Sequence, residues 1–349
     1  MVARSAPPPT PSGDALGEPS WSSASERRAA FLRRIEARLG EVVSQEHRLE
    51  RAARRLLLAN DAKRARALVC LALGDAWHVP AAHTVEVAAV IELVHGASLL
   101  HDDVVDVSDR RRGEPTVNHV EGNAFAVLCG DLVLARALSL LPKLPNGAQM
   151  IADALDVVTR MTRAAVLEVD ARGRLPDPAR GVALWREMAA GKTGALFGLC
   201  ATLVGRLAQA GNSVDVAVID DAAARLERFG VAFQIVDDLK DLTGADVGKP
   251  RGQDVRERAL NHPLLVAVAK DAGFATAVTA VWQRPGALAD DVVYGICDRA
   301  MHAGAGAAID EARAAVVDNE GVANDDLVEV IGWARGLVEQ AAHLVGGAA

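Results

Sequence analysis

Aromatic residues are scarce in this chain. They make up 3% of its 349 residues, with a single tyrosine, so the stacking surfaces on which proteins bind single-stranded nucleic acids have little to be built from. Positive charge is also in deficit, because 38 Lys and Arg stand against 46 Asp and Glu and the net charge is −8 at pH 7. A nucleic-acid binder needs a basic face. The composition therefore excludes that class of function.

Cysteine is rare too. The four present are widely spaced, without a CxxC pair: Cys70, Cys129, Cys200 and Cys297. This pattern predicts neither a disulfide framework nor a zinc site and favours a reducing compartment. Charged residues or histidines interrupt every long apolar stretch, so we expect no transmembrane segment. The first residues lack the apolar core of a secretory signal, and we therefore expect a cytoplasmic protein.

Helix-forming sequence, by contrast, is abundant. Residues 1–22 contain five prolines and are expected to form a disordered leader. Across residues 23–349 Ala, Leu, Arg and Val dominate, and apolar residues such as Leu39, Val42 and Leu49 recur at roughly helical spacing. No stretch alternates as a strand would, and 50% of the residues are hydrophobic, enough for a large core. The sequence predicts one large all-α domain of about ten helices.

Two short acidic clusters stand out, each near the carboxyl end of an apolar helical stretch. The first Asp cluster is Asp102, Asp103 and Asp106, and the second Asp cluster is Asp237, Asp238 and Asp241. Positions i and i+4 of a helix share a face, so the outer two carboxylates of each cluster project together. Carboxylate oxygens suit hard divalent cations, above all Mg²⁺, shared with substrate phosphates. Solvated acidic helix ends are the alternative, which the repetition of the pattern disfavours.

Basic residues accompany the clusters along the chain. They are Arg111 and Arg112 directly after the first cluster, Lys63 and Arg66 on one face of an upstream helix, Lys192, and Lys249. Taken singly, each is more often a surface ion-pair partner, and His95 alone would be assigned to the core. Arg and Lys together with carboxylates, however, are the groups that bind a diphosphate. With an apolar, low-aromatic interior, they predict a site for a diphosphate that carries an apolar chain.

With these motifs identified, the sequence resembles the trans-isoprenyl diphosphate synthases, also called polyprenyl synthetases. The matching text is LLHDDVVDVSDRRRGEPTVN at the first cluster and FQIVDDLKDLTGADVGKPRGQDVRE at the second, with AKRARA, GDLVLARAL and GKTGALF at fitting positions. The resemblance covers roughly residues 35–270. It implies an all-α fold around a deep central cavity, a homodimer, and a prenyltransferase that uses Mg²⁺ or Mn²⁺. The implied reaction condenses isopentenyl diphosphate with an allylic diphosphate to give a linear trans-polyprenyl diphosphate.

The resemblance also implies roles for individual residues by position. The six aspartates of the two clusters would form the metal site, with Asp238 adjacent to the direct ligands. The allylic diphosphate would contact Arg111, Lys192 and Lys249. Isopentenyl diphosphate would be held through its diphosphate by Lys63, Arg66, His95 and Arg112. Lys192, Thr193 and Gln234 would carry catalysis, the last two near the developing allylic cation.

Three positions depart from the family pattern. Ala259 stands where relatives commonly have a Lys, next to Arg258, and Leu167 replaces the Gln of a GQxxD pattern whose Asp would be Asp170. The text NDAKRARA lacks the glycines and the proline of GGKRxRP. These departures leave the six candidate metal ligands intact.

Small residues precede the first Asp cluster. Ala97 and Ser98 stand five and four positions before Asp102, where family members that make short products have bulky, often aromatic residues. A helical turn rises about 5.4 Å, roughly the length of one extended isoprene unit, so an open turn admits a longer chain. We therefore expect a product longer than geranylgeranyl diphosphate. The alternative is that Ala97 and Ser98 merely allow close helix packing.

Two other functions compete with this reading. A class I terpene cyclase also uses an Asp-rich motif and Mg²⁺, but it would need an NDxxSxxxE-like second motif and an aromatic-lined pocket. A non-catalytic partner subunit of a heteromeric prenyl synthase would be expected to lose metal ligands, and Ala259 is the main observation in its favour. Peripheral contact with a membrane, through which an apolar product would be released, also stays open.

Overall fold

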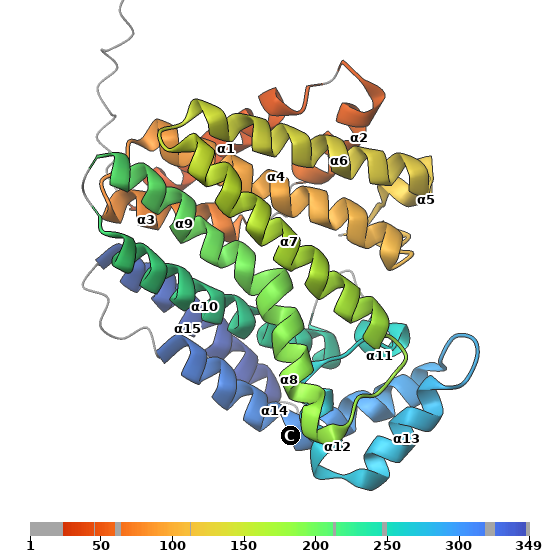
Figure 1. Cartoon of the computed structure of the whole chain (residues 1–349). Coiled ribbons are helices and arrows are strands. Elements are labelled where there is room, and N and C mark those ends of the chain that lie inside the picture. The colour runs from red at the N-terminus through yellow and green to blue at the C-terminus, as the bar shows by residue number, and fades with distance from the viewer. Residues whose placement is uncertain are drawn as a thin grey trace, which may run out of the picture.

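The computed structural model describes residues 24–44, 46–59, 64–111, 113–211, 214–245, 250–317 and 325–346. The expected leader, residues 1–22, and the candidate site residues Lys63, Arg112 and Lys249 lie outside these ranges. Figure 1 shows that the described part is a stack of long helices. Its strands are a single antiparallel pair, β1 (Arg110–Arg111) and β2 (Glu114–Pro115). The all-α prediction is confirmed.

The expectation of about ten helices was too low. The described residues form α1 (Ala24–Val42), α2 (Arg48–Leu57), α3 (Ala65–Ala76), α4 (Ala81–Val105), α5 (Val117–Glu121), α6 (Asn123–Leu140), the 3₁₀ turn η1 (Leu141–Lys143), α7 (Gly147–Ala171), α8 (Pro178–Ala189), the π-helical turn η2 (Ala190–Gly194), α9 (Ala195–Ala210), α10 (Val216–Thr243), α11 (Gln253–Glu257), α12 (His262–Lys270), α13 (Ala272–Trp282), α14 (Asp290–Val317) and α15 (Asp325–Gly346).

Side-chain caps account for part of the larger number. His47 begins α2 within a capping box that includes Glu50, which divides an apolar stretch that looks continuous in the sequence. The carboxylate of Asp271 accepts a hydrogen bond from the Phe274 N–H and begins α13 directly after α12. Such caps satisfy N–H groups that a helix start leaves without partners.

The core is built around α4, which is apolar on nearly all of its faces. Val87, Ala88, Val90 and Ile91 are completely buried, and α4 packs against α3, α6 and α9. A second layer forms where α10 packs against α9 and α14; Figure 1 shows α9 and α10 side by side. A helix that is hydrophobic all round is stable only when it is covered on all sides. The sequence of α4 therefore fixes its interior place and brings the first Asp cluster to one end of the core.

Membrane crossing is not excluded by length and composition. Three helical segments are long and apolar enough to span a bilayer: Ala81–Val105, Asn123–Lys143 and Pro178–Ala210. The fold buries 72% and 78% of the most apolar windows of the first and third, but only 39% of that of the second. The expected lack of a transmembrane segment therefore stays a prediction.

Candidate active site

The first Asp cluster lies at the carboxyl end of α4. The helix ends at Val105, and Asp106 is its C-cap. Val107 then adopts a left-handed φ of 52°, and the Ser108 N–H donates to the Asp103 carbonyl at 2.9 Å. A helix carboxyl end carries partial negative charge, so carboxylates placed there repel it as well as one another. The arrangement is stable only if cations lie close by.

Each carboxylate of the first cluster has its own cation, and each cation comes from a different element. Lys192 Nζ, on η2, lies 3.5 Å from Asp102 Oδ1. Arg111, on β1, donates through both Nε and Nη2 to Asp103 Oδ1, each at 2.8 Å. Arg172, which follows α7, places Nη2 2.5 Å from Asp106 Oδ1. Two of these cations, Arg111 and Lys192, are residues that the sequence singles out.

Burial nevertheless opposes ionisation in this cluster. It raises the pKa of Asp102 above its ordinary value, although the charge of Lys192 acts in the opposite direction. Burial likewise raises the pKa of Asp103 against the hydrogen bond from Arg111. Like charges add to the effect, since Asp106 raises the pKa of both residues. The cluster therefore holds carboxylates that a further cation would stabilise in the ionised form.

The π-helical turn η2 carries Lys192 and Thr193 into the site. Glycines on either side let its backbone pack closely: a Cβ at Gly191 would lie 2.7 Å from Ala164 Cβ, and one at Gly194 would lie 2.8 Å from the Glu227 carbonyl oxygen. The turn η2 therefore packs closely between α7 and α10. Single π-helical turns inside α-helices occur frequently at functional sites.

Lys192 is half-buried and lies between two carboxylates. In addition to Asp102, its Nζ contacts Glu168 Oε2 at 2.7 Å. Burial alone would lower the pKa of Lys192, but the charges of Asp102 and Glu168 outweigh it and raise that pKa. The side chain therefore stays an ammonium ion inside the site.

Hydrogen bonds continue from η2 to the second Asp cluster. The Thr193 hydroxyl donates to Gln234 Oε1 at 3.0 Å, and Gln234 Nε2 donates to Asp238 Oδ1 at 3.1 Å. The other oxygen of Asp238 accepts from the His262 backbone N–H at 2.8 Å. The short turn η2 thus joins the two clusters, because its Lys192 contacts Asp102 and its Thr193 reaches Asp238 through Gln234.

The three aspartates of the second cluster have different surroundings. Asp238 is buried, and burial raises its pKa to about 8 despite its hydrogen bonds. Asp237 lies 4.0 Å from Lys240 one turn along α10. Asp241 accepts hydrogen bonds from the backbone N–H groups of Gln253 and Asp254, at 2.9 and 3.2 Å, and so caps α11. Asp237 and Asp241 are therefore the half-exposed members of the cluster.

The carboxylates of the two clusters do not form a preassembled metal-binding site in the described residues. Within the ranges that the structure describes, no group of three or more His, Cys, Asp and Glu side chains is disposed to hold one metal ion. This arrangement is compatible with Mg²⁺ binding, because Mg²⁺ usually takes one or two carboxylates and completes its octahedron with water and substrate phosphate oxygens. The all-oxygen donor set of the half-exposed aspartates meets that requirement.

Arg66 occupies a different environment from the cations at α4. It lies on α3 with its guanidinium 4.7 Å from the centroid of the Phe197 ring, and burial lowers its pKa. Its Nε is buried without a hydrogen-bond partner in the described part of the chain. The neighbouring Arg64 pairs with Glu92 at 2.9 Å instead. His95 lies half-buried on α4, about two turns before the first cluster.

The structure shows the surroundings of two of the positions that depart from the family pattern. Arg258 does not turn toward the Asp clusters, since its Nη2 donates to the carbonyls of Arg284 and Gly286 at 2.8 and 2.7 Å, and Ala259 is buried. Asp170 is exposed, whereas Glu168, two residues earlier, contacts Lys192. Sequence reasoning missed Glu168 and Arg172. Their spacing of one helical turn is the signal that could have marked them.

Of the two candidate chain-length residues, one lies in the packed core and the other is half-buried. Ala97 is buried, and the Ser98 hydroxyl donates to the His95 carbonyl at 2.8 Å. Close packing is evident nearby, where a Cβ at Gly96 would lie 2.3 Å from Leu57 Cδ2. This supports the packing explanation of the small residues and does not test the length of the product.

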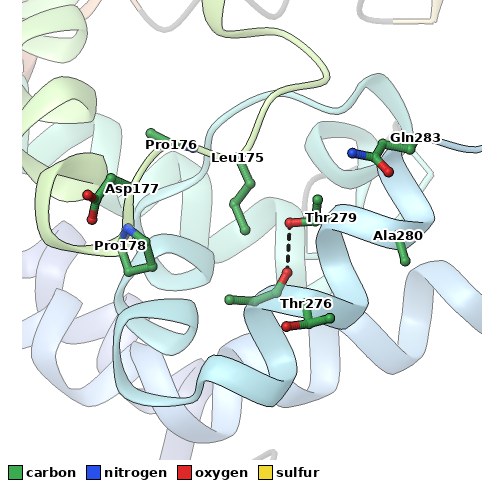
Figure 2. A pocket seen from close by; sticks show the side chains of 9 residues that line it. Leu175, Pro176, Asp177, Pro178, Thr276, Thr279, Ala280 and Gln283 are labelled. Atoms are coloured by element: carbon green, nitrogen blue, oxygen red, sulfur yellow. Dashed lines mark hydrogen bonds between the residues drawn. The ribbon is translucent and has the colours of Figure 1, made fainter.

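A pocket of about 450 Å³ lies between the α7–α8 loop and α13. Figure 2 shows that Leu175, Pro176 and Pro178 form one side of it, and Thr276, Thr279 and Gln283 the other. The one charged side chain in its lining is Asp177, which caps α8. Without a basic side chain this pocket is not suited to a diphosphate.

Known proteins resemble this chain over most of its length. The model of the family described as polyprenyl synthetase matches residues 46–291. The chain is 37% identical over 221 residues to a geranylgeranyl diphosphate synthase of Mycobacterium tuberculosis, and the match spans 59% of this chain and only 59% of that relative's length.

Two solved structures share the fold. A decaprenyl diphosphate synthase from Rhodobacter capsulatus gives a TM-score of 0.77 at 27% identity, covering 91% of this chain and 98% of the other. A polyprenyl synthase from Caulobacter crescentus, complexed with calcium and isoprenyl diphosphate, gives 0.68 at 26% identity, covering 92% and 95%.

Proposed function

The chain belongs to the polyprenyl synthetase family, and from this premise we propose that it is a chain-elongating prenyltransferase. It condenses isopentenyl diphosphate with an allylic diphosphate to give a linear trans-polyprenyl diphosphate. The observation that carries the proposal is the link between the two Asp clusters through η2, in which Lys192 contacts Asp102 and Thr193 reaches Asp238 through Gln234. A diphosphate bound between two carboxylate clusters needs such a lysine at its centre.

We further propose that Mg²⁺, or Mn²⁺, is held by the half-exposed aspartates of the clusters, namely Asp102, Asp106, Asp237 and Asp241. Asp103 and Asp238 are 2% and 4% exposed, and their carboxylates are already engaged by Arg111 and by the His262 N–H. These two residues position the others. When bound, the metal ions supply positive charge that lowers the cost of releasing a diphosphate. The structure of the Caulobacter crescentus polyprenyl synthase, which is complexed with calcium, supports the proposal of a divalent cation.

Other residues of the chain bind the two substrates. Arg111 and Lys192, with Lys249, bind the allylic diphosphate, and its carbon–oxygen bond breaks as the diphosphate leaves. The double bond of isopentenyl diphosphate, held by Arg66 and His95 with Lys63 and Arg112, attacks the allylic carbon. A carbon–carbon bond forms, and the released diphosphate takes the proton that isopentenyl diphosphate loses. The oxygens of Thr193 and Gln234 lie close to the developing cation, and the apolar interior excludes water.

Incubation of the purified chain with Mg²⁺, isopentenyl diphosphate and an allylic diphosphate tests the proposal. A linear polyprenyl diphosphate is the expected product. A cyclic hydrocarbon from the allylic substrate alone would identify a terpene cyclase, and no product without a second subunit would identify a non-catalytic partner. The scarcity of aromatic side chains, 3% of the sequence, disfavours the cyclase because cyclic cations need aromatic faces.

For the product we propose a chain longer than geranylgeranyl diphosphate. The support is the small side chains of Ala97 and Ser98 on α4, together with relatives that differ in product: a geranylgeranyl diphosphate synthase by sequence and a decaprenyl diphosphate synthase by structure. Chromatography of the dephosphorylated products decides it. Products that end at four isoprene units or fewer would contradict this proposal.

We also propose that the enzyme is a cytoplasmic homodimer that associates through α6. On this helix Leu128 is 57% exposed and Val127 is 39% exposed, and only 39% of its most apolar window is buried within the chain. Contiguous exposed apolar surface is characteristic of a protein interface. A second copy is the occupant favoured by the family. The four free, buried cysteines suit a reducing compartment.

A further inference from the structure

We propose that Arg172, which no sequence motif marks, binds the diphosphate group of the allylic substrate beside the first Asp cluster. The inference rests on the prenyltransferase function proposed above and adds a substrate-binding residue to that site. It starts from the carboxyl end of α7, where the side chains of Glu168 and of the C-cap residue Arg172 both reach the site.

Glu168 and Arg172 lie one helical turn apart and therefore on the same side of the end of α7. Glu168 Oε2 contacts Lys192 Nζ at 2.7 Å, and Arg172 Nη2 contacts Asp106 Oδ1 at 2.5 Å. A cation at this place is also favoured by the partial negative charge of the helix carboxyl end. The carboxyl end of α7 thus supports the cations of both outer carboxylates of the first cluster. Glu168 binds Lys192, the cation at Asp102, and Arg172 is itself the cation at Asp106.

Arg172 keeps donors available for a ligand. Besides the contact of Nη2 with Asp106, Nη1 donates to the Val105 carbonyl at 3.3 Å. Nε, however, is buried and has no hydrogen-bond partner among the described residues. A buried N–H without an acceptor is costly, so an oxyanion that satisfies it is bound with a net gain. The planar guanidinium presents its donors as a fork that fits phosphate oxygens in pairs.

The surroundings keep Arg172 at the site. Burial lowers its pKa, but the hydrogen bond and charge of Asp106 and the charges of Glu168 and Glu257 outweigh it, and the pKa is raised. The arginines that follow the second Asp cluster are engaged elsewhere: Arg256 pairs with Asp290 at 2.7 Å, and Arg258 binds the carbonyls of Arg284 and Gly286. Arg172 is accordingly the guanidinium that the described structure places at Asp106.

The test compares three variants of the full chain: Arg172→Gln, Arg172→Lys and Arg174→Gln. Arg174 lies on the same loop and is exposed, so it controls for the loss of one positive charge. Binding of inorganic diphosphate in the presence of Mg²⁺ is measured by calorimetry, and binding of Mn²⁺ alone by electron paramagnetic resonance. Neither measurement requires turnover. Thermal unfolding of each variant reports on the fold.

We expect Arg172→Gln to weaken diphosphate binding roughly 10- to 100-fold, the loss typical of a charge-assisted contact. Arg172→Lys should recover part of it, and Arg174→Gln should change it less than threefold. Mn²⁺ binding should not weaken in Arg172→Gln, because the guanidinium competes with the metal for Asp106. Unchanged diphosphate binding, or an equal fall in diphosphate and Mn²⁺ binding, would overturn the inference. A wild-type chain that binds diphosphate but forms no product would instead overturn the proposed function.

Discussion

The ammonium group of Lys192 lies 3.5 Å from Asp102 and 2.7 Å from Glu168, inside a turn that glycines hold against its neighbours. Its removal would leave two half-buried carboxylates, Asp102 and Glu168, without their cation. Arg66, on α3, is half-buried next to Phe197 instead and has no carboxylate within ion-pair distance in the described residues. The two residues therefore belong to different parts of the site, and their substitution should affect different substrates.

Lys192→Ala should raise the Michaelis constant for the allylic diphosphate or lower the turnover number. Arg66→Ala should raise the Michaelis constant for isopentenyl diphosphate more than that for the allylic substrate. Each loss removes a charge-assisted contact of about 1.5–3 kcal/mol, or roughly 10- to 150-fold. Steady-state kinetics with each substrate varied in turn provides the measurement. Equal losses for both substrates in both variants would show that the two subsites are assigned wrongly.

Asp102→Ala and Asp237→Ala should each lower turnover by about three orders of magnitude or more, because each would remove a proposed metal ligand at the leaving group. Excess chelator should abolish the activity of the wild type, and Mg²⁺ should restore it. Asp170→Ala is the matched control, since Asp170 is an exposed aspartate on α7 and its loss should leave turnover within about twofold. Activity that survives chelation would contradict the metal-dependent reaction.

Among the elements, the amino end of α12 supports the second Asp cluster through its backbone. The His262 N–H donates to Asp238, while the His262 ring lies 2.9 Å from Glu311 on α14. Arg186, on α8, donates to both oxygens of Glu311, at 2.5 and 2.8 Å. Glu311 therefore ties α8, α12 and α14 together behind the cluster. Burial disfavours its ionisation, but the bonds to Arg186 and His262 outweigh it and lower the pKa of Glu311 to about 2.

This depressed pKa has a defined effect on stability. The carboxylate stabilises the fold above the ordinary pKa of a glutamate, near 4.5, and that contribution is lost as the pH falls toward about 2. Glu311→Gln should lower the free energy of unfolding at pH 7 by about 1–2 kcal/mol, a value reduced for the solvent exposure of Arg186. Its stability should also fall less steeply between pH 4.5 and pH 2 than that of the wild type.

Urea unfolding of the metal-free chain at a series of pH values measures this difference, with Glu187→Gln, an exposed glutamate on α8, as the control. Parallel pH profiles for Glu311→Gln and wild type would show that the Glu311 carboxylate does not contribute.

The proposed path of the growing product runs through the apolar interior beside α4. Ala97→Phe adds an aromatic ring below the first cluster, on the side where a growing chain is expected. Product analysis should show a shorter chain, and Mg²⁺ dependence should be unchanged because no metal ligand is altered. Because Ala97 is buried, thermal unfolding of the variant must be checked. A stable variant with the wild-type product length would place the growing chain elsewhere.

At the scale of the whole molecule, the apolar side of α6 leads to a prediction about assembly. Leu128→Asp should convert a dimer to monomers, because it places a charge at the most exposed of the large apolar side chains on that helix. Sedimentation equilibrium measures the mass, and Leu155→Asp on α7, also exposed, shows how far the interface extends. A wild-type chain that is monomeric at micromolar concentrations would contradict the dimer.

The fold class was predictable because helical periodicity and the largely apolar sequence of α4 are properties of the sequence itself. The number of helices was not, since caps such as His47 and Asp271 act through local geometry. Both Asp clusters were identified from spacing, whereas the places of Lys192 and Arg111 beside them were implied by the family resemblance. Glu168 and Arg172 were missed because isolated charged residues on an amphipathic helix look like any solvated face until the fold brings them to Lys192 and Asp106.

Because each carboxylate of the first cluster is paired with its own cation, we expect Mg²⁺ and diphosphate to bind cooperatively. Mg²⁺ arriving alone meets aspartates already neutralised, and diphosphate arriving alone meets lysine and arginine already neutralised. Arriving together, the two ligands exchange partners with the protein while local electroneutrality is conserved. The shift in melting temperature with Mg²⁺ and diphosphate combined should therefore exceed the sum of the two separate shifts, because the protein's own ion pairs are exchanged for new ones only when both ligands bind.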